Sequence, residues 1–233
     1  MGGGRAARGA PAAGAPRLAG AARLAGAVLA GYALGGLPSA DMATRLATGG
    51  GTDLRTEGSG NPGAVNAMKV LGRGWGTAVL AADIAKGALA CAVGRAVAGG
   101  TGSHLGGTAA VVGHCFPVAK RFKGGKGVAA SVGQCLATFP AYFPIDLAVA
   151  ALSSTGPRRR RAAAATVLSS GAWIGGAILW WRRGWPNLWG PRPTAALPLA
   201  AGASSAVVLY RFAAAAGVGS ATAATAGQRE ERR

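Results

Sequence analysis

The chain has 233 residues, half of them hydrophobic, and its 25 lysines and arginines against 7 acidic residues give a net charge of +18. The basic residues lie between long uncharged segments instead of along one amphipathic helix, which argues against a DNA-binding domain and against nucleic acid as a partner. Cys91, Cys115 and Cys135 are too far apart for a CxxC metal or redox motif and odd in number, so we expect neither a metal site nor a disulfide framework.

The chain begins with a basic segment rich in Gly, Ala and Pro that has no apolar core long enough for a separate signal peptide, so residues 1–21 are predicted to be a disordered tail. A membrane-spanning helix needs about 20 apolar residues, although short helices buried among others can be less apolar. Residues 22–215 are predicted to form an all-α, polytopic membrane domain of about seven transmembrane helices, followed by a second disordered tail at 216–233. The expected helices are 24–46, 76–98, 105–119, 127–139, 142–154, 162–181 and 195–213.

The segment 127–154 fits either one span or two short helices separated by FPAYFP at 139–144. One span would place the arginine run 158–161 on the side opposite the cations of the loop 120–126, against the positive-inside tendency. We therefore predict two helices, with the N-terminus outside and the C-terminus inside.

The first informative loop, 49–74, contains GSGNPG at 58–63, which formally fits the dinucleotide pattern GxGxxG. A preceding membrane helix is the wrong context for that pattern, which needs a β-strand. The glycines do allow close approach of an anion, Ser59 and Asn61 can donate hydrogen bonds, and Lys69 follows about two helical turns after Pro62. A solvated loop between helices is the alternative.

The second informative loop is GHCFPVAKRFKGGKGVAAS at 113–131. Its Gly-Gly-Lys-Gly segment can turn successive backbone N–H groups toward one anion, and Lys123 and Lys126 add charge-assisted contacts to phosphate oxygens. Gly127 stands where a Walker A loop has Ser or Thr, which disfavours binding of a magnesium nucleotide. A basic flank that sets membrane topology is the alternative.

Four ionisable residues, Asp41, Asp83, Lys86 and His114, fall inside predicted spans, where such groups line a cavity or pair. Asp83 and Lys86 have i, i+3 spacing on one helix face, which fits a structural ion pair or a role in positioning a substrate. His114 fits a general base, a loop anchor or a satisfied interior histidine, and the anchor is favoured because no carboxylate lies at a useful spacing in sequence. No catalytic triad, HExxH or paired-carboxylate pattern is visible, so we assign no catalytic residue.

Four ordered motifs, YALGGLPSADMATRL, TDLRTEGSGNPGAVNAMKVLG, LAADIAKGALA and the second loop, resemble the bacterial acyl-phosphate:glycerol-3-phosphate acyltransferases. The resemblance implies a seven-helix enzyme of the bacterial cytoplasmic membrane, surrounded by membrane lipids, with its active face in the cytoplasm. Such an enzyme takes acyl phosphate and glycerol 3-phosphate to lysophosphatidic acid and phosphate in phospholipid synthesis. It uses no cofactor and no metal, and the leaving phosphate can accept the hydroxyl proton.

Carried over by position, the resemblance gives a set of substrate-binding residues, to which Lys69 and Lys123 are added as cations of the two loops. Asp83 and Lys86 are assigned as supporting residues. Phe212 and the alanines after it stand where the family has a polar terminal motif, and Val65, Lys69 and Ala130 also depart from its pattern. A degenerate member that binds lipid phosphate or a partner without turnover is therefore the second hypothesis, and a transporter is the third. The substrate-binding set is Ser59, Gly60, Asn61, Gly63, Asn66, Lys69, His114, Lys123, Gly124, Gly125, Lys126 and Gly127.

Overall fold

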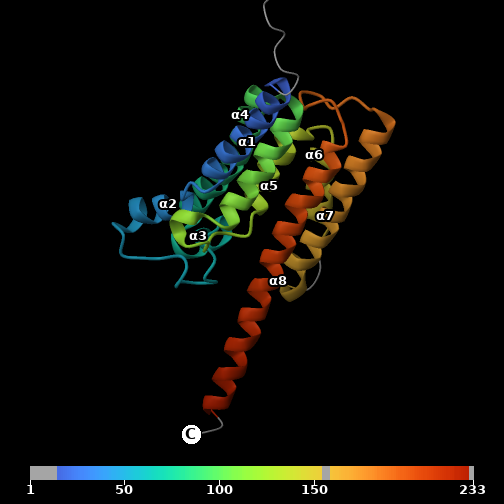
Figure 1. The fold of residues 1–233 in the computed structure, drawn as a ribbon. Coiled ribbons are helices and arrows are strands. Elements are labelled where there is room, and N and C mark those ends of the chain that lie inside the picture. The colour runs from blue at the N-terminus through green and yellow to red at the C-terminus, as the bar shows by residue number, and fades with distance from the viewer. Residues whose placement is uncertain (1–14, 154–157, 231–233) are drawn as a thin grey trace, which may run out of the picture.

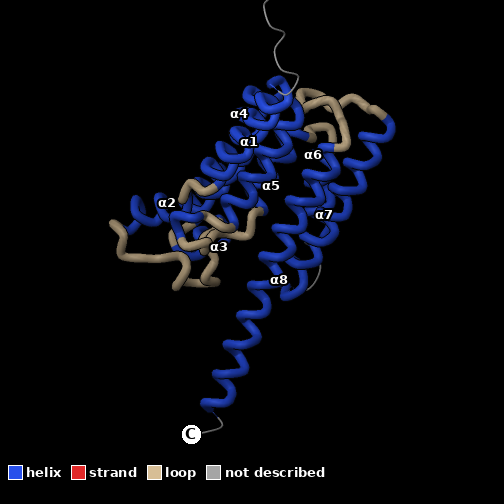
Figure 2. Tube along the Cα trace, in the orientation of Figure 1, coloured by secondary structure: helices blue, strands red, loops and turns tan. Residues whose placement is uncertain are grey.

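Helices make up all the regular secondary structure in the part of the chain that the computed structural model describes, residues 15–153 and 158–230. This confirms the all-α prediction, and Figure 2 shows helices joined by loops and turns. The helices are α1 (Ala15–Gly35), α2 (Ser39–Thr48), α3 (Ala64–Val70), α4 (Arg73–Cys115), α5 (Val128–Thr138), α6 (Phe143–Ser153), α7 (Arg158–Arg183) and α8 (Ala196–Glu230), with a 3₁₀ turn η1 (Val118–Lys120).

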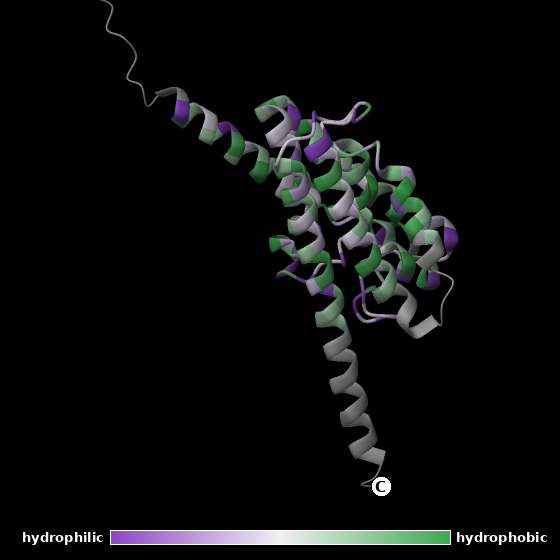
Figure 3. Ribbon diagram, turned by 90° about the vertical axis from the view of Figure 1, so that its right-hand side faces the viewer, coloured by the Kyte–Doolittle hydropathy of each residue, from purple (hydrophilic) through white to green (hydrophobic). Residues whose placement is uncertain are grey.

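Four helical stretches in this part of the chain, 17–48, 73–120, 164–183 and 196–215, are long and apolar enough to cross a membrane, and α5 is a shorter apolar helix. Hydrophobic and intermediate residues cover most of the bundle in Figure 3. These features fit a polytopic membrane protein. The small helices α2 and α3 and the long loops beside them gather at one end of the bundle (Figure 1).

The helix α4 is a hairpin of two antiparallel halves. Ala98 and Gly99 leave the helical conformation, and Gly99 has a φ of 67° that suits glycine. Gly94 then faces Gly102 so closely that a Cβ on either residue would collide with the carbonyl oxygen of the other. The separate helices predicted on either side of residue 98 are therefore present as the two halves of α4.

The predicted helix 24–46 is wrong as a single helix. The chain leaves α1 after Gly35 and re-enters a helix at Ser39, because Pro38 cannot continue the hydrogen-bond pattern of a helix interior. The break turns the start of α2 toward α4 and places Ser39 at its first residue. By contrast, the predicted division of 127–154 is confirmed, since α5 ends at Thr138 and α6 begins at Phe143.

The turn between α5 and α6 is fixed by a buried aromatic cluster. The rings of Phe139 and Tyr142 stack with centroids 5.2 Å apart, and the edge of Trp180 from α7 contacts Phe139 at 5.4 Å. Trp173 and Leu197 complete this core. Aromatic pairs of this kind add to the burial of apolar area. The cluster joins α5, α6, α7 and α8 at the end of the bundle away from α2 and α3 (Figure 1).

The predicted tails overlap helices at both ends. Residues 15–21 belong to α1 and residues 216–230 to α8, whereas 1–14 and 231–233 lie outside the described residues. The helix α7 begins with the arginine run at 158.

Candidate functional site

A buried carboxylate, Asp83, is the centre of a polar network between three helical segments. It is 1% exposed and lies on the first half of α4. Ser39 Oγ donates to Asp83 Oδ1 at 2.5 Å, and Lys86 Nζ lies 2.8 Å from the same oxygen. His114 Nδ1, on the second half of α4, is 3.5 Å away. The predicted i, i+3 pairing of Asp83 with Lys86 is confirmed.

The α4 hairpin explains how residues distant in sequence meet at this carboxylate. Folding at Ala98 brings His114 level with Asp83, and the helix break at Pro38 brings Ser39 to the same point. Lys86 also donates from Nζ to the carbonyl oxygen of Leu37 at 3.2 Å. A buried charge is stable only when it is paired and hydrogen-bonded, and this network meets both requirements for Asp83 and Lys86.

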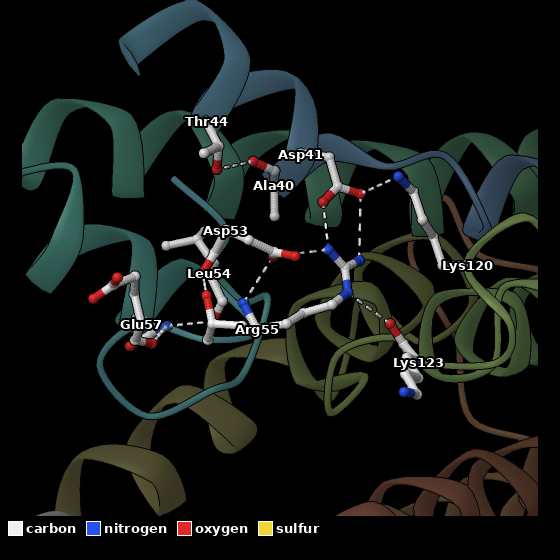
Figure 4. A network of polar contacts seen from close by, with 11 residues as sticks. Ala40, Asp41, Thr44, Asp53, Leu54, Arg55, Glu57, Lys120 and Lys123 are labelled. Carbon is white, nitrogen blue, oxygen red and sulfur yellow. Dashed lines mark hydrogen bonds and ion pairs between the residues drawn. The ribbon is translucent and has the colours of Figure 1, made fainter. Parts of the chain in front are cut away.

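A second ionic network lies at the end of the bundle that holds α2 and α3, and it joins both loops to α2 (Figure 4). Arg55 donates from Nη1 and Nη2 to the two oxygens of Asp41, at 2.5 and 3.3 Å. Lys120 Nζ lies 3.1 Å from Asp41 Oδ2, and Arg55 Nε donates to the carbonyl oxygen of Lys123 at 3.2 Å. The hydrogen bond to Asp41 raises the pKa of Arg55 above its ordinary value. Arg55 is thereby fixed as a cation between the two loops.

The two networks border one narrow cleft. Its charged lining consists of Arg55, Lys86 and Lys120 against the single carboxylate of Asp41, with His114 beside them. Such an excess of cations in a confined space favours an anion. Within the described residues, no three His, Cys, Asp or Glu side chains gather in a way that could hold a metal ion. The surplus of cations in its lining makes the cleft suited to a phosphate group held by protein side chains.

Pro62 and Arg55 of the first loop line this cleft, but none of the first-loop residues that were predicted to bind substrate does. Ser59 and Gly60 are exposed, and neither Asn61 nor Gly63 lines the cleft. Lys69 is exposed on α3.

Asn66 organises the first loop from inside. It is 1% exposed, its Oδ1 accepts the N–H of Ser59 at 2.8 Å, and its Nδ2 donates to the carbonyl oxygens of Leu54 and Glu57 at 3.0 and 2.9 Å. The amide therefore fixes the shape of the loop that carries Arg55.

The second loop reaches the cleft through Gly124 and Gly125. Their N–H groups were expected to turn toward an anion, but they donate to the carbonyl oxygens of Cys115 and His114, at 3.2 and 3.1 Å. A Cβ on Gly125 would collide with the imidazole of His114. These two glycines therefore allow the loop to pack against the end of α4, and the expected anchoring role of His114 fits this contact.

The last described helix holds the second loop from the other side. Arg211 on α8 donates from Nη2 to the carbonyl oxygen of Gly124 at 2.6 Å and from Nε to that of Gly125 at 3.0 Å. Lys126 Nζ lies 4.5 Å from the centre of the Phe212 ring, a cation–π distance. Burial, and then the charge of Arg211, lower the pKa of Lys126. Phe212 therefore lies beside Lys126 of the second loop.

The structure thus brings together some of the predicted residues and adds others. His114, Gly124, Gly125 and Lys86 line the cleft, and Asp83 lies directly behind it. Lys126 and Gly127 belong to the same loop but do not line this cleft, and the side chain of Lys123 is exposed. Among the polar residues that line the cleft, Ser39, Arg55 and Lys120 were not assigned to the site from the sequence. Asp41 was expected only to line a cavity or to pair, and it does both.

Comparison with known proteins gives a consistent result. The family model described as "Glycerol-3-phosphate acyltransferase" matches residues 25–222. Curated glycerol-3-phosphate acyltransferases from Bacillus velezensis and Bacillus subtilis are 44% and 42% identical over 122 residues, which is 52% of this chain and 62% of each relative. The matched segment therefore spans less than two thirds of these relatives.

Solved structures extend the similarity over more of the chain. Crystal structures of PlsY (YgiH), an integral membrane glycerol 3-phosphate acyltransferase, in its glycerol 3-phosphate and lysophosphatidic acid forms, match with TM-scores of 0.63 and 0.61 and identities of 28% and 26%. Each match covers 81% of this chain and 87% of the solved chain.

Proposed function

The chain belongs to the glycerol-3-phosphate acyltransferase family, and on this basis we propose that it transfers an acyl group from acyl phosphate to a hydroxyl of glycerol 3-phosphate. The products are lysophosphatidic acid and inorganic phosphate. The observation that carries this proposal is the order of three adjoining spaces at the end of the bundle that holds α2 and α3: an apolar groove, the cationic cleft and a polar hollow.

The apolar groove meets the cleft at Leu37, Ser39 and Lys86, which line both. It runs between α2 and the first half of α4. An acyl chain in this groove would place an attached phosphate next to Lys86. The apolar lining of the groove consists of Leu37, Met42, Ala43, Leu46, Trp75, Ala78, Val79 and Ala82.

The polar hollow meets the cleft on its other side, at Asp41, Arg55 and Lys120. Arg45 and Arg121 add two further cations to its wall. A water-soluble anion such as glycerol 3-phosphate can enter here without crossing apolar surface. The two substrates would then meet in the cleft, where the cations offset the repulsion between their phosphates.

The reaction needs no group from the protein as a base. The hydroxyl oxygen of glycerol 3-phosphate attacks the acyl carbon and forms the new ester bond, while the bond from the acyl carbon to the phosphate oxygen breaks. The phosphate leaves with that electron pair and accepts the hydroxyl proton. The role of Arg55, Lys86 and Lys120 is to hold and neutralise the phosphates, and alignment of the reactants supplies the acceleration. Asp83 keeps Lys86 and His114 in place.

Binding without turnover is the second candidate. Phe212 and the following alanines replace the polar terminal motif, and the ring of Phe212 already lies against Lys126. A chain that had lost acceptor recognition would still bind acyl phosphate in the groove and cleft.

We further propose seven membrane passes, counted as α1, the two halves of α4, and α5 to α8. The N-terminus is then outside, and the end with α2, α3 and the second loop faces the cytoplasm of a bacterial inner membrane. The positive-inside tendency supports this orientation, since the cations of the second loop and of the first loop lie at that end.

The test is product formation by the purified full-length chain in detergent, supplied with acyl phosphate and glycerol 3-phosphate. We expect lysophosphatidate and phosphate, and no product when acyl-CoA replaces acyl phosphate. Arg55→Gln should lower kcat/KM by about 10-fold to 100-fold, because it removes charge-assisted hydrogen bonds. Arg73→Gln, an exposed arginine outside the cleft, is the matched control.

Two outcomes separate the hypotheses. If acyl phosphate binds to the wild-type chain without product, the candidate that binds without turnover is supported. If neither phosphate compound binds, both candidates are wrong. Loss of turnover in Lys126→Ala would show that Lys126 leaves the ring of Phe212 to contact substrate.

A further inference from the structure

Three polar side chains, Thr108, Gln134 and Ser204, form a buried layer that joins the second half of α4, α5 and α8. Ser204 Oγ donates to Gln134 Oε1 at 2.7 Å, and Gln134 Nε2 donates to Thr108 Oγ1 at 3.2 Å. The hydroxyl oxygens of Ser204 and Thr108 are 3.3 Å apart. Gln134 and Ser204 are both 0% exposed. The polar layer is therefore a closed set of hydrogen bonds inside the bundle.

Each member of the polar layer lies two helical turns from the second loop. Seven residues correspond to about 10.5 Å along a helix and return to nearly the same face. This spacing separates Thr108 from Cys115 at the end of α4, Gln134 from Gly127 before α5, and Ser204 from Arg211 on α8.

An apolar layer lies between the polar layer and the second loop. It consists of Val111, Ala130 and Val208, one from each of the same three helical segments and each three or four residues from a member of the polar layer. All three side chains are buried. Because apolar burial is non-directional, this layer holds the helices together but does not fix how far α8 is shifted along its axis.

The hydrogen bonds of the polar layer supply that missing constraint. A shift of α8 would leave Oε1 of Gln134 buried without a donor, which is costly. Buried polar groups between helices can fix register in this way. The same shift would carry Arg211 away from the carbonyl oxygens of Gly124 and Gly125, which it now contacts at 2.6 and 3.0 Å.

We propose that the polar layer fixes the position of Arg211 and thereby holds the second loop in the shape that borders the cleft. Ser204 and Gln134 are then positioning residues, which act on the loop through Arg211 and touch no substrate. The inference rests on the proposed function where it concerns activity, whereas the shape of the loop can be measured without turnover. Loss of one buried hydroxyl should loosen a loop about two helical turns away.

The test is hydrogen–deuterium exchange of the purified full-length chain in detergent, followed by mass spectrometry over residues 116–127. The N–H groups of Gly124 and Gly125 are hydrogen-bonded to backbone carbonyls at the end of α4, so their exchange reports the shape of the loop. We expect Ser204→Ala to speed exchange in this segment about threefold to tenfold, the range for a hydrogen bond between membrane helices. Arg211→Ala should speed exchange in the same segment.

Two further variants make the comparison specific. Gln134→Met removes the amide at similar volume and should speed exchange of the loop as Ser204→Ala does. Ser205→Ala is the matched control, because its hydroxyl is also buried on α8 but has no hydrogen-bond partner within the described residues. We expect the control to leave exchange of the loop unchanged.

A double-mutant cycle decides whether Ser204 acts through Arg211. In the wild-type background, Ser204→Ala should lower kcat/KM for acyl phosphate about threefold to tenfold. In the Arg211→Ala background it should change neither kcat/KM nor exchange of the loop further, because the contact that it positions is already lost. Additive effects would overturn the proposal, since a merely structural role would add to the loss of Arg211.

The exchange measurement also separates this inference from the proposed function. Unchanged exchange of the loop in both Ser204→Ala and Gln134→Met would overturn the inference. Faster exchange along the whole chain, without excess in residues 116–127, would overturn it as well, because it would show general destabilisation. Absence of turnover in the wild type would contradict the acyltransferase proposal alone, and exchange of the loop would still decide the role of the polar layer.

Discussion

The two glycine-rich loops beside the cleft have similar composition but are held in different ways. The first loop is shaped by one buried side chain, since Asn66 binds backbone groups of Leu54, Glu57 and Ser59. The second loop is held by its own backbone, which pairs with the end of α4, and by Arg211 from the last helix.

The first loop is held by a contact between residues close together in sequence, and the second loop by a contact with a residue far away in sequence. Asn66 acts over a separation of at most 12 residues, so the first loop can keep its shape whatever happens at the C-terminal end. Arg211 acts over 86 and 87 residues, which makes the second loop depend on the position of α8. Changes in α8 should therefore affect activity through the second loop, while changes at Asn66 should affect folding.

The largest expected effect is that of Asn66→Ala on stability. The substitution leaves three backbone partners without their amide, and the carbonyl of the buried Leu54 lies among them. We expect a loss of about 2–4 kcal/mol in the free energy of unfolding. Thermal unfolding in detergent measures it.

Ser59→Ala is the matched control for Asn66→Ala. Its side chain is exposed and its N–H, which survives the substitution, makes the hydrogen bond to Asn66. Equal melting temperatures for Asn66→Ala and Ser59→Ala would show that the amide does not hold the first loop.

The second effect is that of Arg211→Ala on activity. The two lost hydrogen bonds are charge-assisted, and the second loop keeps its backbone bonds to His114 and Cys115. We expect kcat/KM for acyl phosphate to fall about 10-fold to 100-fold with a smaller change in melting temperature than Asn66→Ala causes.

Arg211→Lys keeps the charge but not the forked geometry, and should recover part of the lost activity. Arg182→Ala, at the exposed end of α7, serves as control. A melting temperature lowered as much as in Asn66→Ala, with full activity per folded molecule, would contradict the distinction between the two loops.

The smallest effect concerns pH. Burial lowers the pKa of Lys126, so its positive charge is lost at a lower pH than that of an ordinary lysine as the pH rises. Phosphate binding that depends on this charge is present below that pKa and declines above it. Lys126→Arg keeps its charge throughout, so the alkaline decline of kcat/KM should move to higher pH. An unchanged profile would exclude Lys126 as the titrating group.

Local sequence signals predicted much of the helical architecture. Hydropathy separated the halves of α4, the charges that flank 127–154 favoured two helices divided at FPAYFP, and the i, i+3 spacing of Asp83 and Lys86 predicted their pairing. These features depend on residues close together in sequence. The break at Pro38 was missed because apolar residues continue on both sides of it and hydropathy does not respond to one proline.

The site was predicted less completely, because its contacts join distant segments. Arg55 looked like one of many basic loop residues, and only the fold shows that it reaches Asp41 on α2 and the backbone of Lys123, 68 residues away. Asn66 was placed among the substrate-binding residues by position in a motif, and its burial points to a role in shaping the loop. Residue type and spacing reveal neither the contacts of Arg55 nor the burial of Asn66.

The most direct test of acyl transfer from acyl phosphate to glycerol 3-phosphate is the stoichiometry of the two products. The purified wild-type chain is incubated with acyl phosphate, with and without labelled glycerol 3-phosphate, and both products are counted. We expect phosphate release that requires glycerol 3-phosphate and yields one labelled lysophosphatidate for each phosphate. Bound acyl phosphate with no labelled product, or phosphate released equally without the acceptor, would contradict it.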